Sequence, residues 1–139
     1  MNLTLSHTFI LVDDQDKALA FYRDVLGLDV LTDVKMDDWG MPWRWITLGV
    51  PGQPGIEIGL DPLASKAPAD QEPLRALVAK GALAALIFET DDCDATFEKV
   101  REAGAEVLQE PIDQPYGVRD CAFRDPSGNM VRFSGRRAG

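Results

Sequence analysis

The stretch Phe9-Ile-Leu-Val-Asp-Asp-Gln-Asp16 returns 78 residues later as Ile87-Phe-Glu-Thr-Asp-Asp-Cys-Asp94. Both copies suit a strand that leads into the N-cap and negatively charged first turn of a helix. Gly27 and Gly104 follow at the positions where a left-handed helix cap is expected. The chain therefore contains the same strand–helix unit twice. Apolar residues at helical spacing follow each copy, and these are Leu19, Tyr22 and Val25 in the first and Phe97, Val100 and Ala103 in the second.

Each copy predicts a strand, a helix and then three further strands. Pro and Gly mark a turn before the last strand of each copy, at Gly49–Gly55 and at Asp125–Asn129. Residues 62–82 are rich in Ala, Pro, Asp and Lys and predict a connector with a short helix around 71–80. The expected elements are 5–12, 16–26, 28–35, 43–49 and 55–61 in the first copy, and 83–90, 94–103, 105–110, 117–124 and 129–134 in the second.

A βαβββ unit covers only one face of its sheet with helices, so the other face must meet a second unit or a partner chain. We therefore expect an α+β fold in which two βαβββ modules form a curved mixed sheet with a central cleft. One domain is expected over residues 1–139. Its first module spans about 3–62, its connector about 63–81 and its second module about 82–135. A cleft between the modules is the expected place for a functional site.

The composition narrows the class of partner. Of the 139 residues, 45% are hydrophobic and 27% are charged, as in globular chains that bury a core. The net charge of −9 argues against a nucleic acid or an anionic membrane as partner. No apolar run approaches the roughly 20 residues of a membrane span, and no secretory signal is visible. The two cysteines form no CxxC pair, so we expect reduced thiols in a cytoplasmic protein.

Strand alternation assigns side chains to the cleft face. It marks His7, Glu57, Ala85 and Arg132 as equivalent positions in the two modules. The match of Glu57 with Arg132 is the less secure one, because the loops before the two strands differ in length. Glu89 shares the face of Ala85, one further step of the pleat along the strand.

Two motifs resemble those of the vicinal oxygen chelate superfamily, which contains glyoxalase I, extradiol dioxygenases, fosfomycin-resistance enzymes and bleomycin-resistance binding proteins. They are the tail Phe123-Arg-Asp-Pro-Ser-Gly-Asn-Met-Val-Arg-Phe133 and the stretch Ala18-x-x-Phe21-Tyr22-Arg23-Asp24-x-Leu26-Gly27-Leu28. The resemblance covers nearly the whole chain and implies the glyoxalase/bleomycin-resistance fold. It also implies a homodimer with clefts built across subunits, and a divalent metal held by His or Glu from the first and last strands of each module.

Only His7 and Glu57 match the metal ligands that the resemblance implies. Alanine at position 85 offers no ligand, and the guanidinium of Arg132 stays protonated. A divalent site generally needs three or more protein ligands. We therefore expect no cofactor, with Arg132 in place of the cation and paired with Glu57 or with an anionic group of a ligand. The alternative is Zn, Ni, Mn or Fe held by His7 and Glu57 with help from Glu89, water or a second subunit.

All three tryptophans, Trp39, Trp43 and Trp45, lie within seven residues of one another. They predict either an aromatic wall that stacks a flat ligand or, above all for Trp45, core packing with a dimer contact. Tyr116 and Arg119 precede the seventh strand, where they line the rim of the cleft or form a turn and a surface salt bridge.

The expected function is metal-free binding or sequestration of a small hydrophobic or aromatic molecule, as the bleomycin-resistance resemblance implies. The rival is a metal-dependent lyase, isomerase or dioxygenase similar to glyoxalase I, with Glu57 as ligand or base. A third possibility is an interaction module. His7, Glu57 and Arg132 could instead serve only the structure, through hydrogen bonds and ion pairs with their neighbours. The sequence assigns no catalytic residue. The expected ligand-binding residues are His7, Trp39, Trp43, Glu57, Arg132, Tyr116 and Arg119.

Overall fold

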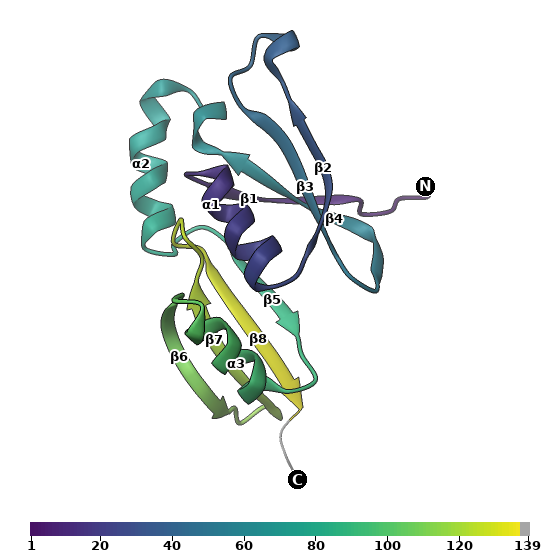
Figure 1. Ribbon diagram of the computed structural model, residues 1–139, viewed down its shortest axis with the longest axis vertical. Helices are drawn as coiled ribbons and strands as arrows, with labels where there is room; N and C mark the ends of the chain where they lie inside the picture. The colour runs from purple at the N-terminus through teal and green to yellow at the C-terminus, as the bar shows by residue number, and fades with distance from the viewer. Residues whose placement is uncertain (137–139) are drawn as a thin grey trace.

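The computed structural model describes residues 1–136 as two βαβββ modules that follow one another along the chain (Figure 1). The connector between them begins its helix at Pro68, three residues before the expected start. The first module comprises β1 (His7–Val12), α1 (Gln15–Leu19), the π-helix η1 (Ala20–Val25), β2 (Asp29–Lys35), the 3-10 helix η2 (Asp37–Trp39), β3 (Arg44–Val50) and β4 (Gln53–Pro62). The connector holds the 3-10 helix η3 (Leu63–Ser65) and α2 (Pro68–Ala79). The second module comprises β5 (Ala85–Glu89), α3 (Cys93–Glu102), β6 (Glu106–Asp113), β7 (Val118–Arg124) and β8 (Met130–Arg136).

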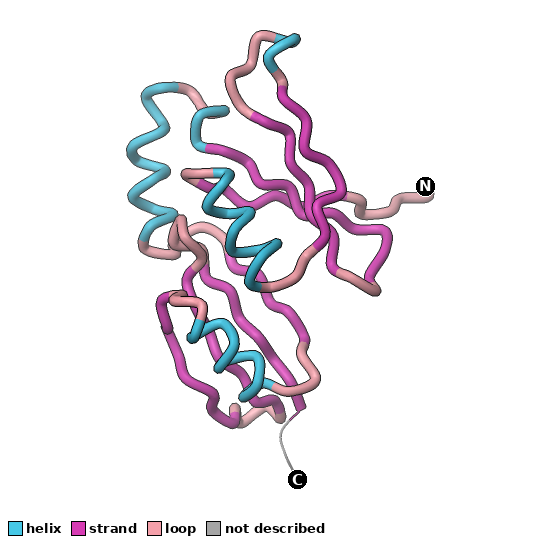
Figure 2. The backbone as a smooth tube through the Cα atoms, in the orientation of Figure 1, coloured by secondary structure: helices cyan, strands magenta, loops and turns pink. Residues whose placement is uncertain are grey.

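Each module has its own four-stranded mixed sheet, with the strand order β1-β4-β3-β2 in the first and β5-β8-β7-β6 in the second (Figure 2). In both sheets the first strand runs parallel to the last, and the other pairs are antiparallel. The expected α+β class with two βαβββ modules is confirmed. Within one chain, however, the strands form two sheets and not one continuous curved sheet, because β1 and β5 are edge strands that pair only inside their own modules.

The sequence repeat is also a repeat of local structure. The side chain of Asp14 accepts a hydrogen bond of 3.0 Å from the backbone N–H of Lys17 at the start of α1. Asp92 does the same for the N–H of Ala95 at the start of α3, also at 3.0 Å. Each aspartate satisfies one of the free N–H groups of a helix start. Among residues 1–136, no helix has the length and apolarity that a membrane crossing requires.

The core lies between each helix and one face of its sheet and is continuous between the modules. Ile46 and Leu48 of β3 point to this layer in the first module, and Phe123 and Val131 do so in the second. The helices α1 and α3 both lie on the viewer's side of their sheets in Figure 1. The opposite face of each sheet is therefore left without a helix, and both of these faces are turned to the same side of the chain.

The turn between β7 and β8 holds the two modules together. Tyr22 of η1 donates a hydrogen bond of 2.7 Å to Asp125, and both groups are buried. The Asn129 amide donates to the backbone oxygen of Leu11 at 2.9 Å. Buried polar groups rely on such partners because water does not reach them. The turn therefore fixes the second module against the first.

Candidate functional site on the open sheet faces

We call the two sheet faces without helices the open faces. Along a strand, side chains alternate between the faces, so the neighbours of the core residues point to the open face. Large apolar side chains lie there exposed, with 47% of Phe9 on β1 and 41% of Trp45 on β3 accessible. Ile87 of β5 is exposed on the second open face. Apolar surface of this kind on a folded chain marks a place where a ligand or a partner binds.

Three rings form what we call the aromatic platform of the first open face: His7, Phe9 and Trp45. The ring centroids of Phe9 and Trp45 are 5.5 Å apart, and His7 lies 6.3 Å from Phe9 and 6.5 Å from Trp45. The Phe9 ring lies directly on the backbone of Gly59, where a Cβ atom would come within 2.3 Å of the ring. Glycine at this position thus lets the platform lie flat on the sheet.

A polar group borders the platform. His7 Nε2 lies 3.3 Å from Glu57 Oε2, and the hydroxyl of Thr47 donates to Glu57 Oε1 at 2.6 Å. His7 Nδ1 lies 2.8 Å from the Ser6 hydroxyl. The parallel ladder of β1 and β4 causes this contact, because it places His7 directly beside Glu57. Both carboxylate oxygens of Glu57 therefore have partners within the chain.

The second open face carries a different polar group, centred on Asp120. Arg132 Nη1 lies 3.1 Å from Asp120 Oδ2 and donates to Gln109 Oε1 at 3.0 Å. The amides of Gln109 and Gln114 donate to Asp120 Oδ1 at 2.8 and 2.9 Å. Asp120 is only 1% exposed. Burial raises its pKa, but the hydrogen bonds from Gln114 and Gln109 and the charge of Arg132 outweigh burial and lower the pKa.

The expected pairing of Arg132 with Glu57 does not form within the chain. The two residues belong to separate sheets, and each has a partner on its own sheet, Asp120 for Arg132 and His7 for Glu57. An ion pair forms with the nearest opposite charge, which strand pairing within a module supplies.

The equivalence of Glu57 with Arg132 is also wrong. In the second sheet Ala85, the counterpart of His7, pairs with Met130, and Arg132 pairs with Ile87. Met130 is therefore the counterpart of Glu57, and Arg132 lies one step of the pleat further along β8. The loops before β4 and β8 differ in length, so the spacing of residues along the chain does not give the equivalent positions on these two strands.

These residues do not fit the divalent metal that the family resemblance implies. His7 and Glu57 are two donors, whereas divalent sites generally use three or more. The counterpart positions hold Ala85 and the thioether of Met130, and Glu89 lies on the second sheet beside Ser134 of β8. Among residues 1–136, no three side chains of the types His, Cys, Asp or Glu are grouped closely enough to hold a metal ion.

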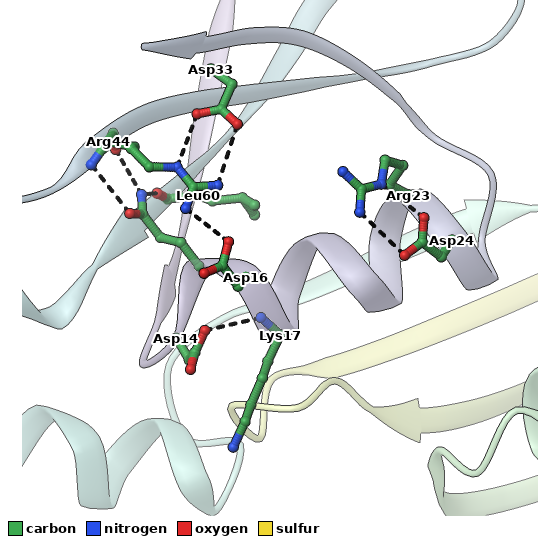
Figure 3. Close-up of polar contacts among 9 residues, drawn as sticks. Asp14, Asp16, Lys17, Arg23, Asp24, Asp33, Arg44 and Leu60 are labelled. Atoms are coloured by element: carbon green, nitrogen blue, oxygen red, sulfur yellow. Dashed lines mark hydrogen bonds and ion pairs between the residues drawn. The ribbon is translucent and has the colours of Figure 1, made fainter. Parts of the chain in front are cut away.

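Trp43 and Arg119 lie beside helices and not on the open faces. Trp43 lines a hollow of about 300 Å³ at the start of α1, next to Arg44. Figure 3 shows Arg44 between Asp16 and Asp33, at 2.8 and 3.0 Å. Arg119 forms its ion pairs with Asp94 of α3 at 3.0 Å and with Asp113 at 3.2 Å. These contacts match the surface salt bridge that the sequence left open for Arg119.

Trp39, the last residue of η2, and Tyr116, in the turn after β6, are exposed. Two residues of the aromatic platform, Phe9 and Trp45, are not among the predicted ligand-binding residues. For Trp45 the sequence leaves an aromatic wall and core packing with a dimer contact as alternatives, the second slightly favoured, and the structure places it outside the core, exposed beside His7. Strand alternation provides the signal for both, since Phe9 follows His7 by two residues and Trp45 precedes Thr47 by two.

A hollow of about 650 Å³ lies on the helix side at the junction of the modules. It lies between η1, the end of α3 and the β7–β8 turn, and it includes Lys17, Phe21, Ala103 and Arg124. None of the predicted ligand-binding residues lines it.

The family model described as "Glyoxalase/Bleomycin resistance protein/Dioxygenase superfamily" matches residues 4–133. The chain belongs to this superfamily. Its structure is similar to that of UcmS2, with a TM-score of 0.85 and 34% identity over 96% of this chain and 98% of that one.

Two other similar proteins have functional descriptions. One is TnmS3, an antibiotic binding protein from Streptomyces sp. CB03234, with a TM-score of 0.72 and 28% identity over 98% of each chain. The other is a probable lactoylglutathione lyase of Vibrio cholerae, 27% identical over 95% of this chain and 90% of that protein. Members of the superfamily that are similar to this chain thus include a binding protein and a probable lyase.

Proposed function

We propose that this superfamily member is a homodimer that binds and sequesters a small aromatic molecule without a metal. In the dimer, the first open face of one subunit faces the second open face of its partner. The aromatic platform is the observation that carries this proposal, because Phe9 and Trp45 lie exposed with their rings 5.5 Å apart. The likeness to TnmS3, an antibiotic binding protein, supports a small-molecule ligand.

The polar group beside the platform favours binding over proton transfer. Both oxygens of Glu57 are engaged, one by Thr47 and one by His7. A general base must accept the proton of a substrate in hydrogen-bond range, and the contacts with Thr47 and His7 instead direct the Glu57 carboxylate toward its own sheet. A flat ligand gains instead from stacking, which contributes about 0.5–1.5 kcal/mol for each aromatic pair beyond the buried area.

The junction of the modules explains why the proposed cleft needs two subunits. Hydrogen bonds of Tyr22 with Asp125 and of Asn129 with Leu11 hold the modules with both open faces on one side of the chain. The two faces of one chain consequently do not close on each other. In a two-fold symmetric dimer, the second copy provides an opposing wall for each of the two open faces, so the dimer contains two equivalent clefts.

The binding test uses the intrinsic fluorescence of 9-anthracenemethanol, a flat neutral aromatic alcohol, followed by anisotropy. We expect wild-type protein to bind this probe and Trp45→Ala to weaken binding about tenfold, which is the loss of one good stacking contact and its buried area. Trp45→Phe keeps a ring and should retain most of the affinity. Equal binding by wild type and Trp45→Ala, or no binding by wild type, would refute the proposed function.

The rival is a metal-dependent lyase, which the likeness to the probable lactoylglutathione lyase supports. Titration of the purified protein with Zn, Ni, Mn or Fe(II), followed by thermal unfolding, separates the two functions. Binding of one ion per site that raises the melting temperature would establish the rival, provided that His7→Ala and Glu57→Gln each abolish this binding.

We also propose that the protein acts in the cytoplasm, where thiols stay reduced. Its cysteines, Cys93 and Cys121, are free and buried. Burial raises the pKa of the Cys121 thiol to about 12, so this group is unreactive at neutral pH.

A further inference from the structure

We infer that the ligand of the cleft carries an oxygen acceptor, a ring carbonyl or carboxylate, which binds to Arg132, and that aromatic compounds with an ammonium group in that place are rejected. This inference rests on the proposed function and adds the chemical class of the ligand. It comes from the second open face, which supplies the wall opposite the aromatic platform in the proposed dimer.

The hydrogen bonds of Arg132 hold its guanidinium group in place and leave part of it free. A guanidinium has five N–H donors. Nη1 meets Gln109 and Asp120 at 3.0 and 3.1 Å, and Nη2 lies 3.7 Å from the sulfur of Met130. Within residues 1–136, Nε has no hydrogen-bond partner. The free donors are therefore pre-oriented for an acceptor from outside the chain.

The strand neighbours of Arg132 do not supply that acceptor. In the sheet, Arg132 lies between Ile87 of β5 and Ala122 of β7, which have apolar side chains. The nearby carboxylate, Asp120, is 1% exposed and contacts Nη1. Once a partner subunit excludes water from this wall, an unpaired N–H is destabilising, and a ligand oxygen is the group that satisfies it.

The charge of the pair decides which ligands fit. Asp120 lies next to Arg132 and balances its charge. The free N–H donors of Arg132 therefore select a ligand by the direction of its hydrogen bonds more than by its net charge. A neutral carbonyl and a carboxylate can both accept a hydrogen bond from these donors. The carboxylate binds more strongly because both partners of its hydrogen bond are charged. An ammonium group offers only donors, so it meets the donors of Arg132 without forming a hydrogen bond.

Three anthracene probes of the same ring size test this inference: anthracene-9-carboxylate, 9-acetylanthracene and 9-(aminomethyl)anthracene. We expect wild-type protein to bind the carboxylate and the ketone at least tenfold more tightly than the amine. Arg132→Met should abolish that preference. Because Arg132→Met leaves Asp120 buried without its cation, the double variant Asp120→Asn/Arg132→Met serves as the second test and removes both charges together.

The outcomes separate the inference from the proposed function. Trp45→Ala should weaken all three probes while keeping their order, because it alters the platform and not Arg132. Binding of all probes with equal affinity, or tighter binding of the amine through Glu57, would overturn the inference and leave the proposed function standing. If no probe binds wild type, the proposed function fails and the inference fails with it. Retention of the preference in both Arg132 variants would also contradict it.

Discussion

Asp120 is a buried carboxylate whose pKa is lowered because three donor side chains surround it. Its neighbours Gln109, Gln114 and Arg132 come from β6, the loop after it and β8, so three segments meet at one side chain. Such a group holds its partners in fixed positions only while it is ionised. Asp120 therefore positions Arg132 on the second open face, although Asp120 itself is buried and out of reach of a ligand.

We predict that Asp120→Asn lowers the free energy of unfolding at pH 7 by about 2 kcal/mol, the contribution of hydrogen bonds to a charged group. The pKa of Asp120 is lowered in the folded protein. Its stabilisation is therefore complete above the unfolded pKa of about 3.9 and is lost as the pH falls through the lower folded pKa. Urea unfolding at pH 7 and pH 3 checks this prediction, with exposed Asp38→Asn as the control. An equal effect of Asp120→Asn at both pH values would contradict it.

At the scale of elements, the β7–β8 turn has two roles, since it closes a hairpin and joins the modules. Asp125 Oδ1 accepts the backbone N–H groups of Ser127, Gly128 and Asn129, each at 2.9 Å. Its other oxygen accepts the hydroxyl of Tyr22. One side chain thus organises the turn with one oxygen and binds the first module with the other.

Tyr22→Phe should therefore lower the free energy of unfolding by about 2 kcal/mol, because it removes a donor from a buried carboxylate and leaves the ring in place. Urea unfolding measures the change. Tyr116→Phe removes the same hydroxyl from an exposed loop residue and is the matched control. If the two variants unfold at the same urea concentration, the turn does not join the modules in the way described.

The elements were largely predictable from the sequence because their signals are local. Asp14 and Asp92 cap their helices as the repeat indicates, and the helix after Asp14 differs only in continuing as the π-helix Ala20–Val25. The site was less predictable, because strand register determines which side chains become the partners of Glu57 and Arg132. Register depends on turn geometry and pairing across the sheet, which the spacing of residues along one strand does not reveal.

At the scale of the whole molecule, the proposed dimer places the first open face of one subunit against the second open face of its partner. A mixing experiment determines this. Trp45→Ala and Arg132→Met each damage one wall. In a heterodimer of the two variants, cross-subunit clefts give one cleft with both defects and one with none.

We predict that refolding the two variants together restores tight binding of anthracene-9-carboxylate to half of the clefts in each heterodimer. Titration of the mixture by anisotropy, beside each variant refolded alone, measures the recovery. If each cleft belongs to a single chain, every cleft keeps a defect and the mixture binds no better than its components. Sedimentation of the wild type should give the mass of two chains.

Gly59 and Gly49 have a consequence for how this scaffold adapts. Phe9 lies on the backbone of Gly59, and the side chain of Leu31 lies on that of Gly49, where an added Cβ would come within 2.8 Å of it. Any side chain introduced at either glycine lifts the group above it while the helix-side packing stays intact. Single substitutions at these two glycines can therefore change how far Phe9 and Leu31 stand above the first sheet, and with that the size of the molecule that the first open face accommodates.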